Sequence, residues 1–215
     1  MKTKLINNNS KELILFLTGW GCDDNQFLNF NSSSKDILLF WDYSTLDFEF
    51  DFSKYEEFYL LTYSAGVYVA GLIQNKLPNF KTKIAINRNP LMFDSHFGID
   101  KETLNIMSNL DEKNVEEFIK KYLIFDENDY KEFIKTPTLR SFESSEIELK
   151  KLEEFYHDFE PVEFDRAILS DSDKIFNPTT QKEYFKQKAK IMKNSAHNVF
   201  SKFKSYDEIL DFANN

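Results

Sequence analysis

The chain has 215 residues, enough for one compact domain that buries about 70% of its unfolded surface without help from a disulfide or a structural metal. Cys22 is the only cysteine, which excludes a disulfide framework and a cysteine-based zinc site. The net charge of −9 argues against general nucleic-acid binding, and a hydrophobic content of 41% argues against disorder.

The N-terminal residues do not read as a secretory signal, because polar residues follow the first lysines where an apolar core would be needed. The longest apolar run, around residues 13–17, is far too short to cross a bilayer. We therefore expect a cytoplasmic protein that does not associate with membranes.

Short apolar runs in the first half of the chain predict buried strands at residues 12–17, 36–41 and 57–63. Small and apolar residues then recur at helical spacing over residues 64–76, which predicts a helix directly after the third strand. A fourth strand is predicted at residues 83–87.

The character of the sequence changes after Asp100. From residue 101 to about 159 the chain is charged, its apolar residues recur at helical spacing, and no strand is predicted. Helical segments are expected at 114–122, 128–134 and 145–156. We interpret residues 100–160 as a helical cap inserted into a single domain that spans residues 1–215.

The last part of the chain returns to alternating elements. Strands are predicted at 164–169 and 189–192, and helices at 178–187 and 206–212. Strands that alternate with helices are typical of βαβ units. The sequence therefore predicts an α/β fold with a mostly parallel sheet and helices on both faces.

A serine stands where the strand at 57–63 meets the following helix, in the run Thr62-Tyr63-Ser64-Ala65-Gly66. A sharp turn from strand to helix presents such a serine at the carboxyl end of a parallel sheet, usually within G-x-S-x-G. Here Thr62 replaces the first glycine. An ordinary helix N-cap is the alternative interpretation of Ser64.

The turn after the first buried strand contains Gly19-Trp20-Gly21, so two of the five glycines of the chain lie in it. In an α/β-hydrolase this loop supplies one N–H of the oxyanion hole, and the residue after the nucleophile supplies the other. By position these are the amides of Trp20 and Ala65. The alternative is an ordinary glycine turn. Cys22 has no evident base, and we interpret it as structural.

An acid and a histidine follow Ser64 in the order that α/β-hydrolases require. Asp173 is the preferred acid because a proline-started helix comes soon after it, and Asp171 is its rival. Asp173 could also be a solvated loop carboxylate or a charge at a helix N-terminus. His197 is the preferred base. His96 precedes the predicted cap and His157 lies near its far end, and both are interpreted as surface or structural residues.

Taken together, these segments resemble the BioG-type pimeloyl-[acyl-carrier protein] methyl ester esterases of biotin synthesis, which belong to the α/β-hydrolase superfamily. The resemblance covers nearly the whole chain, and its most family-specific piece is the segment Asp94-Ser95-His96-Phe97-Gly98-Ile99. The other matching segments are residues 16–21, 41–43, 63–66 and 85–87 and those around Asp173 and His197.

The resemblance implies a compact α/β-hydrolase and a serine esterase. Its substrate would be the methyl ester of pimeloyl-acyl-carrier protein, and its products would be pimeloyl-acyl-carrier protein and methanol. Ser64 would be the nucleophile, His197 its base and Asp173 the acid that orients the base. No metal or organic cofactor is implied.

The carrier protein of that family is acidic, and so is this chain, so attraction between them would need a local basic patch. Lys120, Lys121 and Arg140 in the predicted cap are the candidates for carrier contacts. The alternative is that these residues form solvated helix faces among glutamates.

Other functions remain compatible with the sequence. A thioesterase acting on the same carrier, or a general small-ester carboxylesterase, would use the same three residues. A non-catalytic α/β binding module is the alternative of another class, and it is motivated by the glycine that is missing at Thr62.

Overall fold

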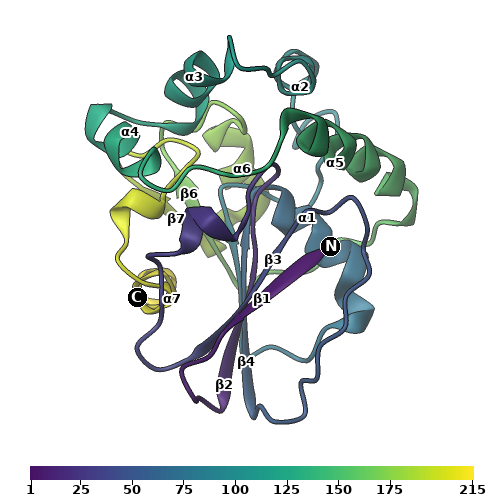
Figure 1. The fold of residues 1–215 in the computed structure, drawn as a ribbon, viewed down its shortest axis with the longest axis vertical. Helices are drawn as coiled ribbons and strands as arrows, with labels where there is room; N and C mark the ends of the chain where they lie inside the picture. The colour runs from purple at the N-terminus through teal and green to yellow at the C-terminus, as the bar shows by residue number, and fades with distance from the viewer.

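A seven-stranded sheet forms the centre of the molecule, with the strand order β1-β3-β2-β4-β5-β6-β7 (Figure 1). Its strands are β1 (Lys2–Ile6), β2 (Glu12–Leu17), β3 (Asp36–Trp41), β4 (Glu57–Tyr63), β5 (Thr82–Ile86), β6 (Arg166–Ser170) and β7 (Ala189–Met192). This computed structural model describes residues 1–215 except the side chains of His157 and Asp158, so the interpretation of His157 lies outside the described residues.

The central parallel strands β2, β3 and β4 are apolar over most of their length because both faces of the sheet are covered. Every residue from Leu13 to Leu17 in β2 has an exposed fraction of 0%. Alternate side chains of β2 enter two separate hydrophobic clusters, one on each face. The predicted α/β fold with a mostly parallel sheet is confirmed.

Helices pack on both faces of this sheet. The cluster that contains Leu13 and Leu15 includes residues of α1 and α6. The cluster that contains Ile14 and Phe16 includes residues of α7. Helices α1 and α7 therefore lie on opposite sides of the sheet, as Figure 1 shows. The α-helices are α1 (Ala65–Ile73), α2 (Lys101–Ser108), α3 (Val115–Phe118), α4 (Glu127–Phe133), α5 (Phe142–Glu154), α6 (Pro178–Phe185) and α7 (Tyr206–Asn214). Shorter helical turns are η1 (Asp24–Phe27), η2 (Gln74–Lys76), the π-helical η3 (Ile119–Leu123), η4 (Phe155–Asp158), η5 (Lys186–Lys188) and η6 (Phe200–Lys202).

Helices α2, α3, α4 and α5, here called the cap helices, lie between β5 and β6 in the sequence. In Figure 1 they sit above the end of the sheet at which the parallel strands finish. Ligands of open α/β sheets bind at this end. The cap helices therefore cover the edge at which the sequence places its candidate residues.

The sequence did not predict the strand β1, because the lysines and asparagines in and after Lys2–Ile6 resemble a polar chain terminus. It lies at the edge of the sheet, pairs antiparallel with β3 and stays partly exposed. A half-covered edge strand needs no continuous apolar run, so its sequence resembles a loop.

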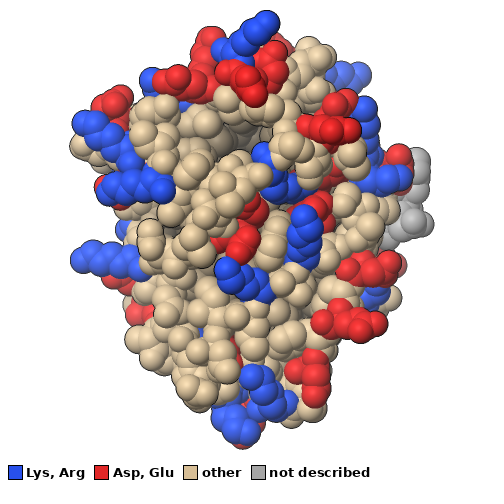
Figure 2. All heavy atoms as spheres, viewed as in Figure 1, with Lys and Arg blue, Asp and Glu red and all other residues tan. Residues whose placement is uncertain are grey.

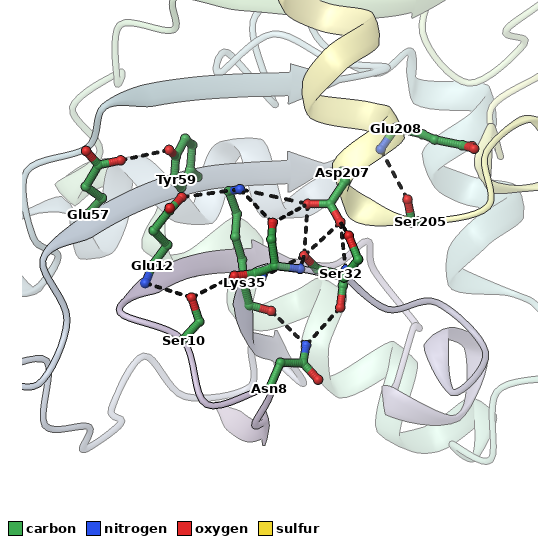
Figure 3. Close-up of polar contacts among 12 residues, drawn as sticks. Asn8, Ser10, Glu12, Ser32, Lys35, Glu57, Tyr59, Ser205, Asp207 and Glu208 are labelled. Carbon is green, nitrogen blue, oxygen red and sulfur yellow. Dashed lines mark hydrogen bonds and ion pairs between the residues drawn. The ribbon is translucent and has the colours of Figure 1, made fainter.

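A polar cluster binds the C-terminal helix α7 to the end of the sheet that lies opposite the cap helices (Figure 3). The carboxylate of Asp207 accepts hydrogen bonds from the hydroxyl of Ser32 at 2.9 Å and the backbone N–H of Ser33 at 2.8 Å. The Lys35 ammonium lies 3.2 Å from a carboxylate oxygen of Glu12 in β2. The cluster joins α7 to the loop before β3, far from the cap helices.

No helix in the described part of the chain is both long enough and apolar enough to cross a membrane.

Candidate active site

Ser64 lies in a sharp turn between β4 and α1. Its backbone has φ 51° and ψ −120°, a left-handed conformation that non-glycine residues rarely adopt and that is typical of strained functional turns. A Cβ atom at Gly66 would collide with the carbonyl oxygen of Leu17 at the end of β2. The glycine thus lets α1 begin tightly against the sheet, which fixes the direction of the Ser64 side chain.

Thr62 replaces the other glycine of the usual motif without disturbing this turn. It is fully buried in β4, and its hydroxyl donates a hydrogen bond of 3.1 Å to the carbonyl oxygen of Ile84 in β5. The polar side chain is therefore satisfied within the sheet.

The structure brings Ser64, His197 and Asp173 into one hydrogen-bonded chain. The Nε2 atom of His197 is 2.8 Å from the Oγ atom of Ser64, and its Nδ1 atom is 2.8 Å from the Oδ2 atom of Asp173. The side chains of His197 and Asp173 are 4% and 3% exposed. This is the geometry of a nucleophile, a base and an acid that orients the base.

The Asp173 carboxylate is held in place by the chain that follows it. Its Oδ1 atom accepts hydrogen bonds from the backbone N–H groups of Ile175 at 2.8 Å and Phe176 at 3.1 Å. Only Oδ2 is left to face the imidazole of His197. The start of the segment that leads into α6 thus aims the carboxylate at the histidine.

Asn87, directly after β5, fixes the loop that carries the histidine. Its amide group donates hydrogen bonds to the carbonyl oxygen of His197 at 2.6 Å and to the hydroxyl of Ser170 at 2.8 Å. Its Oδ1 atom accepts from the backbone N–H of Ser170 at 2.6 Å. The sequence placed Asn87 in a family-like segment but gave no sign of this role, because its partners lie more than 80 residues away.

The rival candidates lie elsewhere. The carboxylate of Asp171 accepts hydrogen bonds from the backbone N–H groups of Asn194 at 3.2 Å and Ser195 at 3.4 Å, in the turn after β7. His96 is exposed, with its Nε2 atom 3.1 Å from a carboxylate oxygen of Glu183. The segment Asp94–Ile99 forms a turn around the Asp94 carboxylate and does not line the cavity described below.

The two amides predicted to bind an oxyanion are available as donors. Ala65 is the first residue of α1, and Trp20 lies in the turn closed by the N–H of Cys22 and the carbonyl oxygen of Gly19 at 3.3 Å. Neither the Trp20 N–H nor the Ala65 N–H donates a hydrogen bond within the described residues. Both belong to turns at the carboxyl ends of neighbouring strands, β2 and β4.

A cavity of about 480 Å³ opens between the sheet and the cap helices. Ser64, His197 and Trp20 line its side toward the sheet. Its apolar wall from the cap side is formed by Met107, Leu110, Val115, Phe118, Ile119, Leu123, Phe133 and Phe142. Figure 2 shows a hollow in this part of the surface, bordered by uncharged atoms and surrounded by charged side chains of both signs.

Cys22 also lines the cavity but is poorly suited to act as a nucleophile. Burial, together with the negative charge of Glu148, raises the pKa of its thiol to about 12. The thiolate is the reactive form of cysteine, so this thiol is inert near neutral pH.

The three candidate carrier contacts differ in their surroundings. Lys120 is exposed and forms an ion pair of 2.6 Å with Glu116, and the Lys121 ammonium lies 4.8 Å from the centre of the Tyr122 ring. Arg140, in contrast to Lys120 and Lys121, is buried. Its side chain is 5% exposed and lies 2.6 Å from a carboxylate oxygen of Glu148, so it presents no free charge to a partner.

No group of three or more His, Cys, Asp or Glu side chains is placed to hold a metal ion among the residues that the structure describes.

The family described as "Pimeloyl-ACP methyl esterase BioG" matches residues 1–209 of the chain. The chain belongs to the BioG family. The resemblance inferred from the sequence is thereby confirmed.

The crystal structure of BioG from Haemophilus influenzae is similar over 97% of this chain and 99% of that chain, with a TM-score of 0.83 and 28% identity. A lipase-esterase related protein from Clostridium acetobutylicum covers 98% of this chain and 99% of its own, with a TM-score of 0.65 and 15% identity. The second likeness shows the α/β-hydrolase fold alone.

A longer relative of this BioG-family chain is a malonyl-[acyl-carrier protein] O-methyltransferase from Bacteroides fragilis. It is 31% identical over 179 residues, which are 80% of this chain and 36% of the relative. The chain therefore spans about a third of that protein.

Proposed function

We propose that this BioG-family chain hydrolyses the methyl ester of pimeloyl-acyl-carrier protein, and that Ser64, His197 and Asp173 are its catalytic residues. The observation that carries the proposal is the chain of two 2.8 Å hydrogen bonds from Asp173 through His197 to Ser64. It lies at the wall of an apolar cavity in a member of an esterase family.

The first half of the reaction forms an acyl-enzyme. The Oγ atom of Ser64 attacks the ester carbonyl carbon while Nε2 of His197 takes its proton. The N–H groups of Trp20 and Ala65 stabilise the negative charge that develops on the carbonyl oxygen. When the bond to the methoxy oxygen breaks, His197 returns the proton to that oxygen and methanol leaves.

The second half releases the acid. His197 takes a proton from a water molecule, whose oxygen attacks the acyl-enzyme carbonyl, and the same two amides stabilise the second oxyanion. The bond to Ser64 then breaks, and its Oγ atom recovers the proton. Throughout, the buried Asp173 carboxylate stabilises the imidazolium form of His197.

The cavity supports an aliphatic ester as the substrate. Its volume of about 480 Å³ lies in the range of small-molecule pockets. Its apolar wall comes from residues 107–142, within the region proposed to be a cap over a single domain. A methylene chain fits such a wall because it removes apolar surface from water on both sides.

The Bacteroides relative gives independent support for a carrier-bound methyl ester. By its name, that protein transfers a methyl group to a carrier-bound acid. Such a transfer makes the kind of ester that we propose this chain to hydrolyse. We accordingly propose an acyl carrier protein as the partner.

We further propose Lys120 and Lys121 as the contacts of this partner and the cytoplasm as the location of the protein.

Rescue of a biotin-requiring strain that lacks its own methyl esterase tests the proposal in a cell. The wild-type chain is expected to restore growth without biotin, and Ser64→Ala at equal protein level is expected not to. Purified wild-type protein should also react with a fluorophosphonate, and Ser64→Ala should not. Fluorophosphonate labelling without rescue would retain a serine hydrolase and reject this substrate.

A further inference from the structure

A buried carboxylate of the cap reaches down to the loops of the sheet. Glu148 in α5 has an exposed fraction of 0%. Its Oε2 atom accepts a hydrogen bond of 3.0 Å from the backbone N–H of Gly21, and its Oε1 atom accepts one of 2.8 Å from the backbone N–H of Tyr43. One side chain of the cap thus holds the loop after β2 and the loop after β3 together.

The charge of this carboxylate is balanced inside the molecule. The Arg140 guanidinium donates to the Oε2 atom of Glu148 at 2.6 Å and lies 3.3 Å from a carboxylate oxygen of Asp42. The ammonium of Lys2 lies 3.1 Å from the other carboxylate oxygen of Asp42. Two acids and two bases therefore form one network. Hydrogen bonds that backbone N–H groups donate to a charged acceptor are stronger than those they donate to a neutral one.

The same helix holds Trp20 by a second bond. The indole N–H of Trp20 donates to the carbonyl oxygen of Ser145 in α5 at 2.6 Å. The side chain of Trp20 and the peptide that follows it are therefore both bound to α5. These two bonds leave the backbone of Trp20 little freedom to rotate.

We propose that Glu148 is a positioning residue for the reaction, which holds the Trp20 amide in the orientation that binds the oxyanion. It acts through the Gly21 peptide and touches no reacting atom. The inference rests on the proposed function and goes beyond it, because a side chain of the cap would then hold a donor of the oxyanion hole in place. An oxyanion donor that is displaced by a fraction of an ångström loses much of its effect on the transition state.

Kinetics of Glu148→Gln on a short aryl ester test this role. The glutamine side chain keeps one acceptor oxygen but turns its NH₂ group toward one of the N–H donors that the Glu148 carboxylate binds. We expect kcat to fall about 10- to 100-fold with KM close to that of the wild type. Glu148→Asp keeps the charge that Arg140 requires but withdraws the carboxylate, and we expect it to fold and to lower kcat in the same way.

A trifluoromethyl ketone separates positioning from a general loss of structure. Addition of Ser64 to its carbonyl forms a C–O bond, transfers the serine proton to His197 and leaves a negative oxygen in the oxyanion hole. Its inhibition constant should rise by the same factor as kcat falls, while that of the corresponding alcohol, which forms no oxyanion, should not change. Glu154→Gln, which removes an exposed carboxylate from the same helix, is the matched control.

The outcomes distinguish this inference from the proposed function. If folded Glu148→Gln and Glu148→Asp keep the kcat of the wild type, or if the affinity for the ketone does not change, Glu148 does not position the amide. If Ser64→Ala abolishes hydrolysis in the same assay, the proposed function still stands. If Ser64→Ala remains active, the proposed function fails as well.

Discussion

Thr62 shows how one side chain can replace a glycine of the hydrolase motif. Its hydroxyl bonds the carbonyl oxygen of Ile84, and the side chain is fully buried. Thr62→Gly would restore the usual motif but would remove this bond and make β4 more flexible. We expect the free energy of unfolding to fall by about 2 kcal/mol in urea denaturation, with kcat close to that of the wild type.

Thr62→Val keeps the shape of the side chain, so its free energy of unfolding isolates the contribution of the hydroxyl to stability. A collapse of kcat in Thr62→Gly, rather than of stability, would show that the residue shapes the turn at Ser64 directly.

Cys22 provides a test of burial beside the candidate active site. Because the pKa of its thiol is raised to about 12, the folded protein should react with iodoacetamide at pH 8 about 10³-fold more slowly than the chain unfolded in urea. Raising the pH of the folded protein from 8 to 9 should increase the rate about tenfold, because the thiolate fraction rises by that factor. Mass spectrometry of timed samples measures both rates. Equal rates in the folded and unfolded chains would contradict the buried environment.

At the scale of elements, the polar cluster around Asp207 anchors α7. Burial alone would raise the pKa of this carboxyl, but the hydrogen bonds from Ser33 and Ser32 outweigh it and hold the pKa below its usual range. The folded state therefore favours the ionised form. The resulting stability is complete above the unfolded pKa of about 4 and is lost as the pH falls through the lower folded value.

We predict that Asp207→Asn lowers the free energy of unfolding by about 1–2 kcal/mol at pH 7. The difference from the wild type should shrink as the pH falls below about 4. Urea denaturation at several pH values measures it, and Asp211→Asn, which alters an exposed acid of the same helix, is the control. A difference that does not depend on pH would show that Asp207 contributes by shape and not by charge.

Strands that are buried on both faces could be predicted from the sequence to the residue. The predicted strands 12–17, 36–41 and 57–63 have the bounds of β2, β3 and β4, because a continuous apolar run has few other stable placements. The edge strand β1 could not, since it has no apolar pattern of its own. The predicted helix at 114–122 covers most of η3, but its π-helical form could not be predicted from helical spacing alone. Their conformation depends on the elements beside them.

The candidate site divides in the same way. The sequence could group Ser64, Asp173 and His197 as candidates because each follows a recognisable strand, and strand ends meet at one edge of a parallel sheet. The structure places their side chains within hydrogen-bond distance of one another. Glu148, which we propose to be a positioning residue, could not be singled out because it stands among many glutamates of a charged helix. The available signal was its position four residues before Leu152, on the side of α5 that is buried.

At the scale of the whole molecule, the net charge of −9 sets the terms for a charged partner. An acidic carrier protein would be repelled at long range and would need local cations. Lys120 in η3 is exposed, although Glu116 shares its charge. Lys121 is exposed beside it.

We predict that the double variant Lys120→Glu with Lys121→Glu raises KM for the carrier-bound ester about three- to tenfold and leaves kcat close to that of the wild type. The effect should weaken at high salt. Lys81→Glu is the matched control, because Lys81 is ion-paired with Glu57 at the other end of the sheet. An unchanged KM would place the carrier elsewhere on the surface.

We propose that Ser64, activated by His197 and Asp173, removes a methyl group from a carrier-bound ester. Mass spectrometry of pimeloyl methyl ester on acyl carrier protein, incubated with the wild-type chain or with Ser64→Ala, follows this reaction itself. We predict that the wild type converts the substrate to a carrier lighter by the mass of one CH₂ group, with methanol released, and that Ser64→Ala leaves it intact. Release of the unacylated carrier would reveal a thioesterase, and an unchanged mass with the wild type would contradict the claim.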